Sequence, residues 1–249
     1  MIEGLYDIFE HWHKDRQTVW IYSDTHFNDE ELAAGVASRP IAGIHLANIN
    51  SKVGKKDTFI HLGDVGDIEF IRKIKGYKVL IAGNHDAGLS NYKRIVHDFK
   101  LDAETYSKEQ ALEYAKKLYP NCKYAIEKGY QFSFPFEFWH IYADNGLFDE
   151  VYGGPVMIAE KLILSHEPVD CPWAFNIHGH IHDSKHKNDK HHFNVCSDAI
   201  GYVPINMNQW MKQGYLSHIE SIHRTTIDKA TERKKKRGGK FFNNHGQKR

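Results

Sequence analysis

Acidic residues and histidines fall in five short blocks along the chain, and their types and spacing favour metal chemistry. In chain order the blocks are Asp24-x-His26, Gly63-Asp64, Gly83-Asn84-His85-Asp86, Ser165-His166 and Gly179-His180-x-His182. An Asp-x-His pair arises readily by chance in a chain with 18 histidines. Gly-Asn-His-Asp and Gly-His-x-His do not, so these two blocks carry most of the specificity.

The side chains in these blocks offer carboxylate oxygen, amide oxygen and imidazole nitrogen, which hard and borderline divalent metals prefer. Two such ions about 3.5 to 4 Å apart repel each other, and a carboxylate between them lowers that repulsion. Asp64 follows a central predicted strand and is the candidate for this bridge. The sequence therefore predicts a two-metal site built from Asp24, His26, Asp64, Asn84, His166, His180 and His182.

Apolar runs that stop at polar residues would gather these ligands. Residues 18–24 and 57–64 are typical strands that end at Asp24 and Asp64. A helix over 68–75, capped by Asp67, and a strand over 77–83 complete a βαβ unit. Strand ends at one edge of an α/β sheet converge on one crevice. Shorter strands predicted over 160–168, 174–182 and 191–198 favour an antiparallel or mixed sheet, hence an α/β (α+β) fold.

The five blocks, in this order, resemble the calcineurin-like metallophosphoesterase superfamily over about residues 18–198, and the first three are most similar to small bacterial and phage members. The resemblance implies a four-layer αββα sandwich with two mixed β-sheets and the metal site at the C-terminal ends of strands. It assigns one metal ion to Asp24, His26 and His182, the other to Asn84, His166 and His180, with Asp64 between them.

The resemblance also makes His85 the proton donor or phosphate-contacting residue, oriented by Asp86. It implies two divalent transition-metal ions, with manganese favoured and iron, zinc, nickel or cobalt as alternatives. The expected reaction is hydrolysis of a phosphomonoester or phosphodiester by in-line attack of a metal-bridging hydroxide. A nuclease or cyclic-nucleotide phosphodiesterase is the alternative enzyme. A protein-binding scaffold that has lost catalysis is less favoured, because no ligand is missing.

Other polar residues near the blocks are candidates for supporting or substrate-binding roles. Arg39 either contacts the substrate phosphate or is a surface arginine before a loop proline. Asn194 and Asp198 are expected to support the ligands from outside. The histidines at 186, 191 and 192 lie in a Lys-rich stretch that predicts a solvated hairpin.

Length and charge predict one main domain over residues 1–228 and a basic tail over 229–249. The tail has nine Lys or Arg and one acid, which gives it a net charge of +8. Because the whole chain has a net charge of +1, residues 1–228 carry a net charge of −7. We expect the tail to be disordered. It either holds nucleic acid or is a solvated terminus.

Within the main domain, residues 99–155 form an insertion with a helix that stops at Pro120 and an aromatic stretch over 129–148. That stretch is a lid, an oligomer contact or, as we favour, a set of core strands. A short N-terminal helix is expected to pack through Ile2, Leu5, Phe9 and Trp12. Pro204, Ile205 and Trp210 predict a final packed turn and helix.

No apolar run approaches the roughly 20 residues needed to span a bilayer, and the N-terminus lacks the pattern of a secretory signal. The three cysteines form no close pair, which argues against disulfides and thiolate zinc sites. We therefore expect a soluble cytoplasmic protein with a phosphate-ester substrate and no membrane partner. The oligomeric state cannot be predicted.

Overall fold

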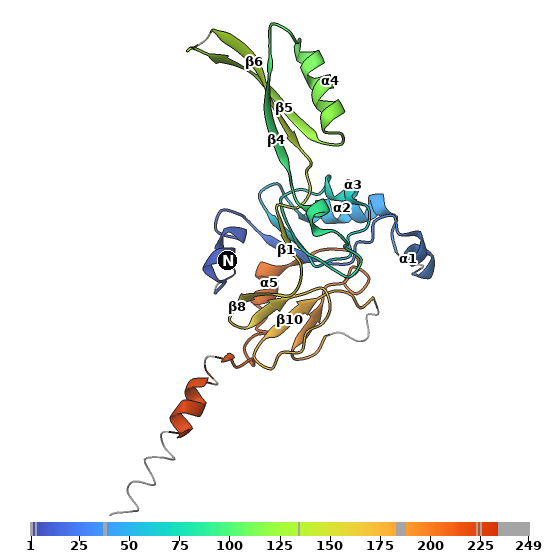
Figure 1. Ribbon diagram of the computed structural model, residues 1–249. Coiled ribbons are helices and arrows are strands. Elements are labelled where there is room, and N and C mark those ends of the chain that lie inside the picture. The colour runs from blue at the N-terminus through green and yellow to red at the C-terminus, as the bar shows by residue number, and fades with distance from the viewer. Residues whose placement is uncertain are drawn as a thin grey trace, which may run out of the picture.

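The computed structural model describes residues 2, 4–36, 39–133, 135–182, 188–222, 224 and 226–233. Within these residues the chain mixes helices with three β-sheets, two of them mixed and one antiparallel. Two sheets form a body, and the third belongs to a lobe that projects from it (Figure 1). The coarse α+β prediction is confirmed.

A five-stranded sheet lies at the centre of the body in the order β12-β1-β2-β3-β7. Neighbours from β1 to β7 are parallel, and β12 pairs antiparallel with β1. Its strands are β1 (Val19–Tyr22), β2 (Thr58–His61), β3 (Tyr77–Ile81), β7 (Glu150–Tyr152) and β12 (Ile205–Asn206). Strand β2 is buried at every position, as expected where both faces of a parallel sheet are covered.

The second body sheet has the order β11-β10-β9-β8, with parallel pairs except for antiparallel β8. Its strands are β8 (Val156–Ala159), β9 (Leu162–Leu164), β10 (Phe175–His178) and β11 (His192–Asn194). The two sheets share one apolar core, in which Ile21 and Ile60 from the first lie with Leu164 and Ile177 from the second. Two mixed sheets therefore face each other.

Helices cover the outer face of the five-stranded sheet. Ile49 of α2 (Ala42–Lys52) and Ile71 of α3 (Ile68–Ile71) pack with Tyr22, Phe59 and Leu80. The Asp67 side chain accepts the Glu69 N–H, as the predicted cap requires. Helix α3 is shorter than predicted because tight turns at Lys73 and Ile74 return the chain to β3. Two further short helices are α1 (Glu30–Gly35) and η2 (Leu89–Tyr92).

The outer face of the four-stranded sheet is covered differently. The loop over 167–172 lies here, and the Val169 N–H donates to the buried Asn176 side chain at 2.8 Å. The Val169 carbonyl faces His192 Nε2 at 3.3 Å. In the described parts of the chain, a loop and not a helix therefore packs on this face.

Segments at both ends of the main domain pack against its apolar core. The N-terminal segment forms η1 (Asp7–Trp12), and its four predicted apolar anchors are at most 8% exposed. Trp210 of α5 (Met207–Met211) is 3% exposed and packs on Phe175. The packing of both elements is confirmed, but the N-terminal helix begins only at Asp7, and Leu5 instead forms a β-bridge with Ala159. Truncating a tryptophan of this kind to alanine typically costs about 3 to 5 kcal/mol.

The lobe is a three-stranded antiparallel sheet, order β4-β6-β5, with one helix on one face. It comprises β4 (Val96–Asp102), α4 (Lys108–Leu118), β5 (Lys123–Gln131) and β6 (Phe136–Asp144). Ser107 and Gln110 form a capping box at the start of α4, and its Ala111 and Ala115 pack on Ile141. The helix ends before Pro120, as predicted.

The predicted insertion bounds, 99–155, need correction. The lobe spans 96–144, whereas β7 and β8 belong to the two body sheets. The favoured core-strand interpretation of the aromatic stretch is correct only in part. Phe138 and Ile141 are buried, but Phe132 is 89% exposed near the tip.

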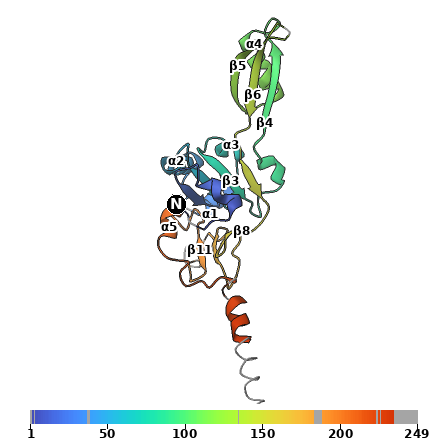
Figure 2. The same cartoon turned by 90° about the vertical axis from the view of Figure 1, so that its left-hand side faces the viewer.

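The chain continues beyond α5 into a helical segment over 226–233, which points away from the body on the side opposite the lobe (Figure 1, Figure 2). Residues 229–233, predicted to be disordered, are therefore helical. The remainder of the basic tail and His186 lie outside the described residues. No helix in the described ranges combines the length and apolar character needed to cross a membrane.

Candidate metal centre

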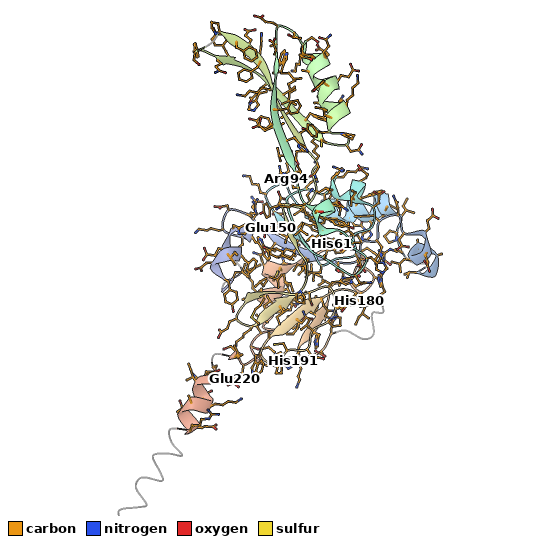
Figure 3. All side chains as sticks on the ribbon, viewed as in Figure 1. His61, Arg94, Glu150, His180, His191 and Glu220 are labelled. Carbon is orange, nitrogen blue, oxygen red and sulfur yellow. The ribbon has the colours of Figure 1, made fainter. Side chains whose placement is uncertain are left out.

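The strand ends bring the predicted ligands to one border of the body. Asp24, Asp64 and Asn84 follow β1, β2 and β3, and these strands are parallel neighbours. His166 and His180 each stand two residues after β9 and β10 of the facing sheet. His180 lies well away from the lobe (Figure 3). All seven residues converge where the C-terminal ends of both sheets meet.

One cluster contains Asp64, Asn84, His166 and His180. Asn84 Oδ1 lies 2.9 Å from His166 Nε2 and 3.1 Å from His180 Nδ1. The two histidine nitrogens are 3.1 Å apart, so the three atoms form a nearly equilateral triangle. Asp64 Oδ2 is 3.2 Å from His166 Nε2.

A second cluster contains Asp24, His26, Asp64 and His182. Asp64 Oδ2 lies 3.4 Å from His26 Nε2, and Asp24 Oδ1 lies 3.7 Å from His182 Nε2. The same Asp64 oxygen thus approaches a histidine of each cluster. This shared carboxylate is the position predicted for the bridge.

The spacing of these atoms fits a bound divalent ion. Metal–ligand distances of about 2.1 Å set neighbouring ligand atoms about 3.0 Å apart in an octahedron and about 3.4 Å apart in a tetrahedron. The contacts around Asp64 and Asn84 fall between 2.9 and 3.4 Å. In addition, His26 Nε2 is buried without a hydrogen-bond partner among the described residues. The donor set suits a transition-metal ion.

Three of the histidine rings are held through their other nitrogen. His166 Nδ1 donates to the Leu62 carbonyl at 2.7 Å, which leaves Nε2 facing the cluster. His182 Nδ1 lies 2.6 Å from Asp198 and His26 Nδ1 lies 3.1 Å from Asp29. Carbonyl and carboxylate groups accept hydrogen bonds, so they fix the proton on Nδ1 and leave Nε2 facing the cluster.

The electrostatics favour proton release on metal binding. Burial raises the pKa of Asp64, but the adjacent His166 and His26 rings and the hydrogen bond from the His85 N–H outweigh burial and hold the pKa well below its ordinary value. Burial lowers the pKa of His26 and of His166. The nearby Asp64 has a larger opposite effect, so the pKa of each histidine lies above its ordinary value. Burial raises the pKa of Asp24. A metal ion would displace the protons these groups share.

Four candidate ligands have left-handed backbone conformations, which non-glycine residues seldom adopt. Their φ angles are 58° for Asp24, 37° for His26, 58° for Asp64 and 66° for His180. Each such residue costs about 1 to 3 kcal/mol and persists only where its surroundings hold it. The ligand loops are therefore fixed by the rest of the fold.

Two glycines of the motifs are needed for space. A Cβ on Gly83 would stand 2.2 Å from Asp64 Oδ1, and one on Gly179 would stand 2.0 Å from Ser23 Oγ. Neither position leaves room for any side chain. Glycine thus lets the ligand loops approach each other closely.

Asp86 has a different role from the predicted one. Its carboxylate accepts the backbone N–H groups of Asp64 at 2.8 Å, Val65 at 3.0 Å and Gly83 at 2.9 Å. It therefore holds the two ligand loops together instead of orienting His85. His85 is exposed, and its ring centroid lies 5.5 Å from that of His26.

Arg39 fits neither sequence interpretation, because its side chain is only 3% exposed. The guanidinium donates to Asp198 at 2.7 Å and to the carbonyls of Asp24 and Thr25 at 2.7 and 2.6 Å. These bonds use its N–H groups inside the protein. Arg39 is a buried support for the Asp24 loop.

Sequence reasoning placed Asn194 and Asp198 behind the ligands, and both contact the ligand loops. Asp198 accepts from His182, and the Asn194 side chain donates to the Ile181 carbonyl at 2.7 Å. Asp29 was missed, although it stands three residues after His26 and caps α1.

Cys196 was also missed, and no sequence signal indicates it. It lies close enough to Asp24 and His182 to be grouped with them. However, Sγ approaches His182 Nδ1, the nitrogen that faces Asp198, at 3.6 Å. Burial raises the pKa of this thiol, and metals bind the thiolate. We therefore place Cys196 behind the ligands.

A cleft of about 410 Å³ opens over the clusters. Its walls are formed by ligands, by His85 and by residues of α1, including Glu31 and Leu32. No lobe residue lines it in the described parts of the chain, so the lobe is not a lid over this cleft.

The chain matches no protein-family model and no curated protein. Among solved structures, it is similar to a crystal structure of a protein of unknown function from Aquifex aeolicus. The TM-score is 0.45 and the sequence identity 20%, over 79% of this chain and 98% of that chain. This likeness assigns no function, so the functional conclusion depends on the site itself.

Proposed function

We propose that this chain is a dinuclear-metal-dependent phosphoesterase of the calcineurin-like metallophosphoesterase superfamily. The supporting observation is the Asp64 carboxylate, one oxygen of which lies 3.4 Å from His26 Nε2 and 3.2 Å from His166 Nε2. A carboxylate shared by two ligand clusters is the arrangement that two adjacent cations require.

One ion would be held by Asp24, His26, Asp64 and His182, and the other by Asp64, Asn84, His166 and His180. Two bound ions, of manganese or of iron, zinc, nickel or cobalt, would supply Lewis-acid activation of water and charge stabilisation at phosphorus. The oxygen and imidazole ligands suit all of these metals.

The remaining side chains have separate tasks. His85 is exposed at the cleft beside His26, where its imidazole can donate a proton to the departing oxygen of the ester. Asp86 keeps the loops of Asp64 and Gly83 at a fixed distance. The cleft is open enough to admit a phosphomonoester or a phosphodiester.

We also propose that the fold is a variant of the four-layer αββα sandwich. The support is the pair of mixed sheets that share one core, with α2 and α3 outside the first sheet. On the second sheet, the loop over 167–172 takes the position of an outer helical layer.

The test compares Asp64→Asn with Asp67→Asn in protein reconstituted with manganese. Asp67 is a helix cap that asparagine can replace. We expect about two ions per chain in the wild type and the control, and loss of metal and activity in Asp64→Asn. Metal is measured by mass spectrometry, and activity with p-nitrophenyl phosphate and bis-p-nitrophenyl phosphate. Oligonucleotide and cyclic-nucleotide substrates test the nuclease and phosphodiesterase alternatives.

Fewer than one ion per wild-type chain, with no hydrolysis of any substrate, would favour the non-catalytic scaffold. Equal losses in Asp64→Asn and Asp67→Asn would mean that folding, not metal binding, had been disturbed. Only a selective loss in Asp64→Asn supports the proposed bridge.

A further inference from the structure

A second cavity, of about 270 Å³, lies where the lobe joins the body. Six of the residues that line it are basic: Lys55, Lys73, Lys75, Lys78, Arg94 and Lys123. This concentration contrasts with the net charge of −7 on residues 1–228. A cavity of this size can hold a small ligand.

The cavity is remote from the candidate metal centre. Lys78 stands at the N-terminal end of β3, whereas Asn84 follows its C-terminal end. The six residue steps between them correspond to about 20 Å of extended chain. Arg94 and His180 lie on different sides of the body (Figure 3). The two sites are therefore separate.

The acidic residues of the cavity, Asp144 and Asp149, offset the charge of its lysines only in part, because both raise the pKa of Lys78 but burial and Lys123 outweigh them. Asp144 and Asp149 both bind Arg94, at 2.8 and 2.7 Å. No ion pair is formed by Lys55, Lys78 or Lys123 in the described residues. These three ammonium groups remain for an anion.

Lys78 is the buried member of this group, with only 5% of the residue exposed. Its Nζ donates to the carbonyl of Ile71 at 3.1 Å and to that of Gly146, which leaves the third donor of the ammonium group. Burial, together with the charge of Lys123, lowers the pKa of Lys78 to about 8. Like charges are thus held together at a site where a bound anion would relieve their repulsion.

We propose that this cavity binds the phosphate group of a small molecule, through Lys78 and Lys55 of the body and Lys123 of the lobe. Pockets at the junction of two structural units commonly bind small ligands. A ligand here would contact both units and fix the lobe on the body. The site is independent of the proposed metal centre.

The test titrates inorganic phosphate into the chelator-treated full chain by calorimetry, so that no metal-bound phosphate contributes. The variant Lys55→Met/Lys123→Met removes two cavity charges, and Lys56→Met/Lys116→Met removes two charges from exposed positions outside it. We expect affinity to fall about tenfold or more in the first variant and less than twofold in the second. Thermal melting of both variants checks that they fold.

Equal weakening in both variants would overturn the proposal, as would the absence of phosphate binding to the wild type. Equal affinity for phosphate, sulfate and chloride would indicate an adventitious ion only. A single-stranded 12-mer that binds far more tightly than phosphate, with a steep salt dependence lost in Lys55→Met/Lys123→Met, would instead assign the cavity to nucleic acid.

Discussion

The candidate centre depends on how each histidine ring is held from behind. His182 is held by Asp198, and Asp198 in turn accepts from Arg39 and from Tyr202. Burial raises the pKa of Asp198, but the hydrogen bonds from His182 and Tyr202 and the charge of Arg39 lower it to about 2. The carboxylate stays ionised and keeps the His182 proton on Nδ1. Such supporting groups typically change metal affinity or activity by about 10- to 100-fold when replaced.

His85→Ala tests the chemistry of the cleft without removing a ligand. Because His85 lines the cleft but belongs to neither cluster, we expect turnover to fall by about 10² to 10⁴ while metal content stays that of the wild type. Steady-state kinetics and mass spectrometry measure the two quantities. His97→Ala, in the lobe, is the matched control.

Loss of metal from His85→Ala would place His85 among the ligands. Unchanged turnover would remove it from the reaction. Neither result would change the arrangement of ligands around Asp64. The role of His85 is therefore tested independently of the metal centre.

Single residues were predictable where their type limits their chemistry. All seven members of the two clusters were predicted from the sequence, because they are aspartate, asparagine and histidine residues at or near strand ends. Asp86 and Arg39 were misassigned because Asp86 accepts three backbone N–H groups and Arg39 donates to two backbone carbonyls. Sequence patterns do not show which backbone groups will lie beside a given side chain.

At the scale of elements, the lobe has a small core of its own. Ile141 of β6 is fully buried against α4, whereas Phe132 is 89% exposed. We expect Ile141→Ala to lower the free energy of unfolding by about 2 to 5 kcal/mol, and Phe132→Ser to change it by less than about 0.5 kcal/mol. Urea unfolding, followed by circular dichroism, measures both.

A comparable loss in Phe132→Ser would mean that the aromatic tip is covered in solution, as the oligomer-contact interpretation requires. Sedimentation velocity of both variants distinguishes that case. A small effect of Ile141→Ala would contradict the packing of α4 on β6.

Element types were predicted better than element boundaries. Apolar runs indicated β1, β2 and β3 correctly, but the end of the insertion was misplaced by about ten residues. The long-range pairing of β7 with β3 and of β8 with β9 assigns residues 150–159 to the body. Local patterns do not encode such pairing.

Across the whole molecule, buried charge makes stability depend on pH. The pKa of Lys78 falls from 10.5 to about 8 on folding, because of burial and of Lys123. Between these values the unfolded chain keeps a proton that the folded chain has released, so the free energy of unfolding rises with pH. For an interval of this width we expect a rise of about 3 kcal/mol.

The measurement is urea unfolding of the wild type and of Lys78→Met at pH 7.5, 9 and 10.5. The difference between them isolates Lys78 from other titrating groups, including Asp144, Asp149 and Arg94 nearby. We expect the wild type to gain stability relative to the variant as the pH increases. A constant difference would show that Lys78 is not desolvated in the folded chain.

The join between lobe and body has an evolutionary consequence. The two chain crossings lie side by side: Asn145 donates its N–H to the Ile95 carbonyl at 3.0 Å, and Val96 is paired with Asp144. The two chain segments are as close to each other as paired strands of a hairpin. A tight turn could therefore replace the whole lobe without moving either body sheet. The lobe is thus a module that can be gained, lost or exchanged, while the ligand loops at the opposite border keep their geometry.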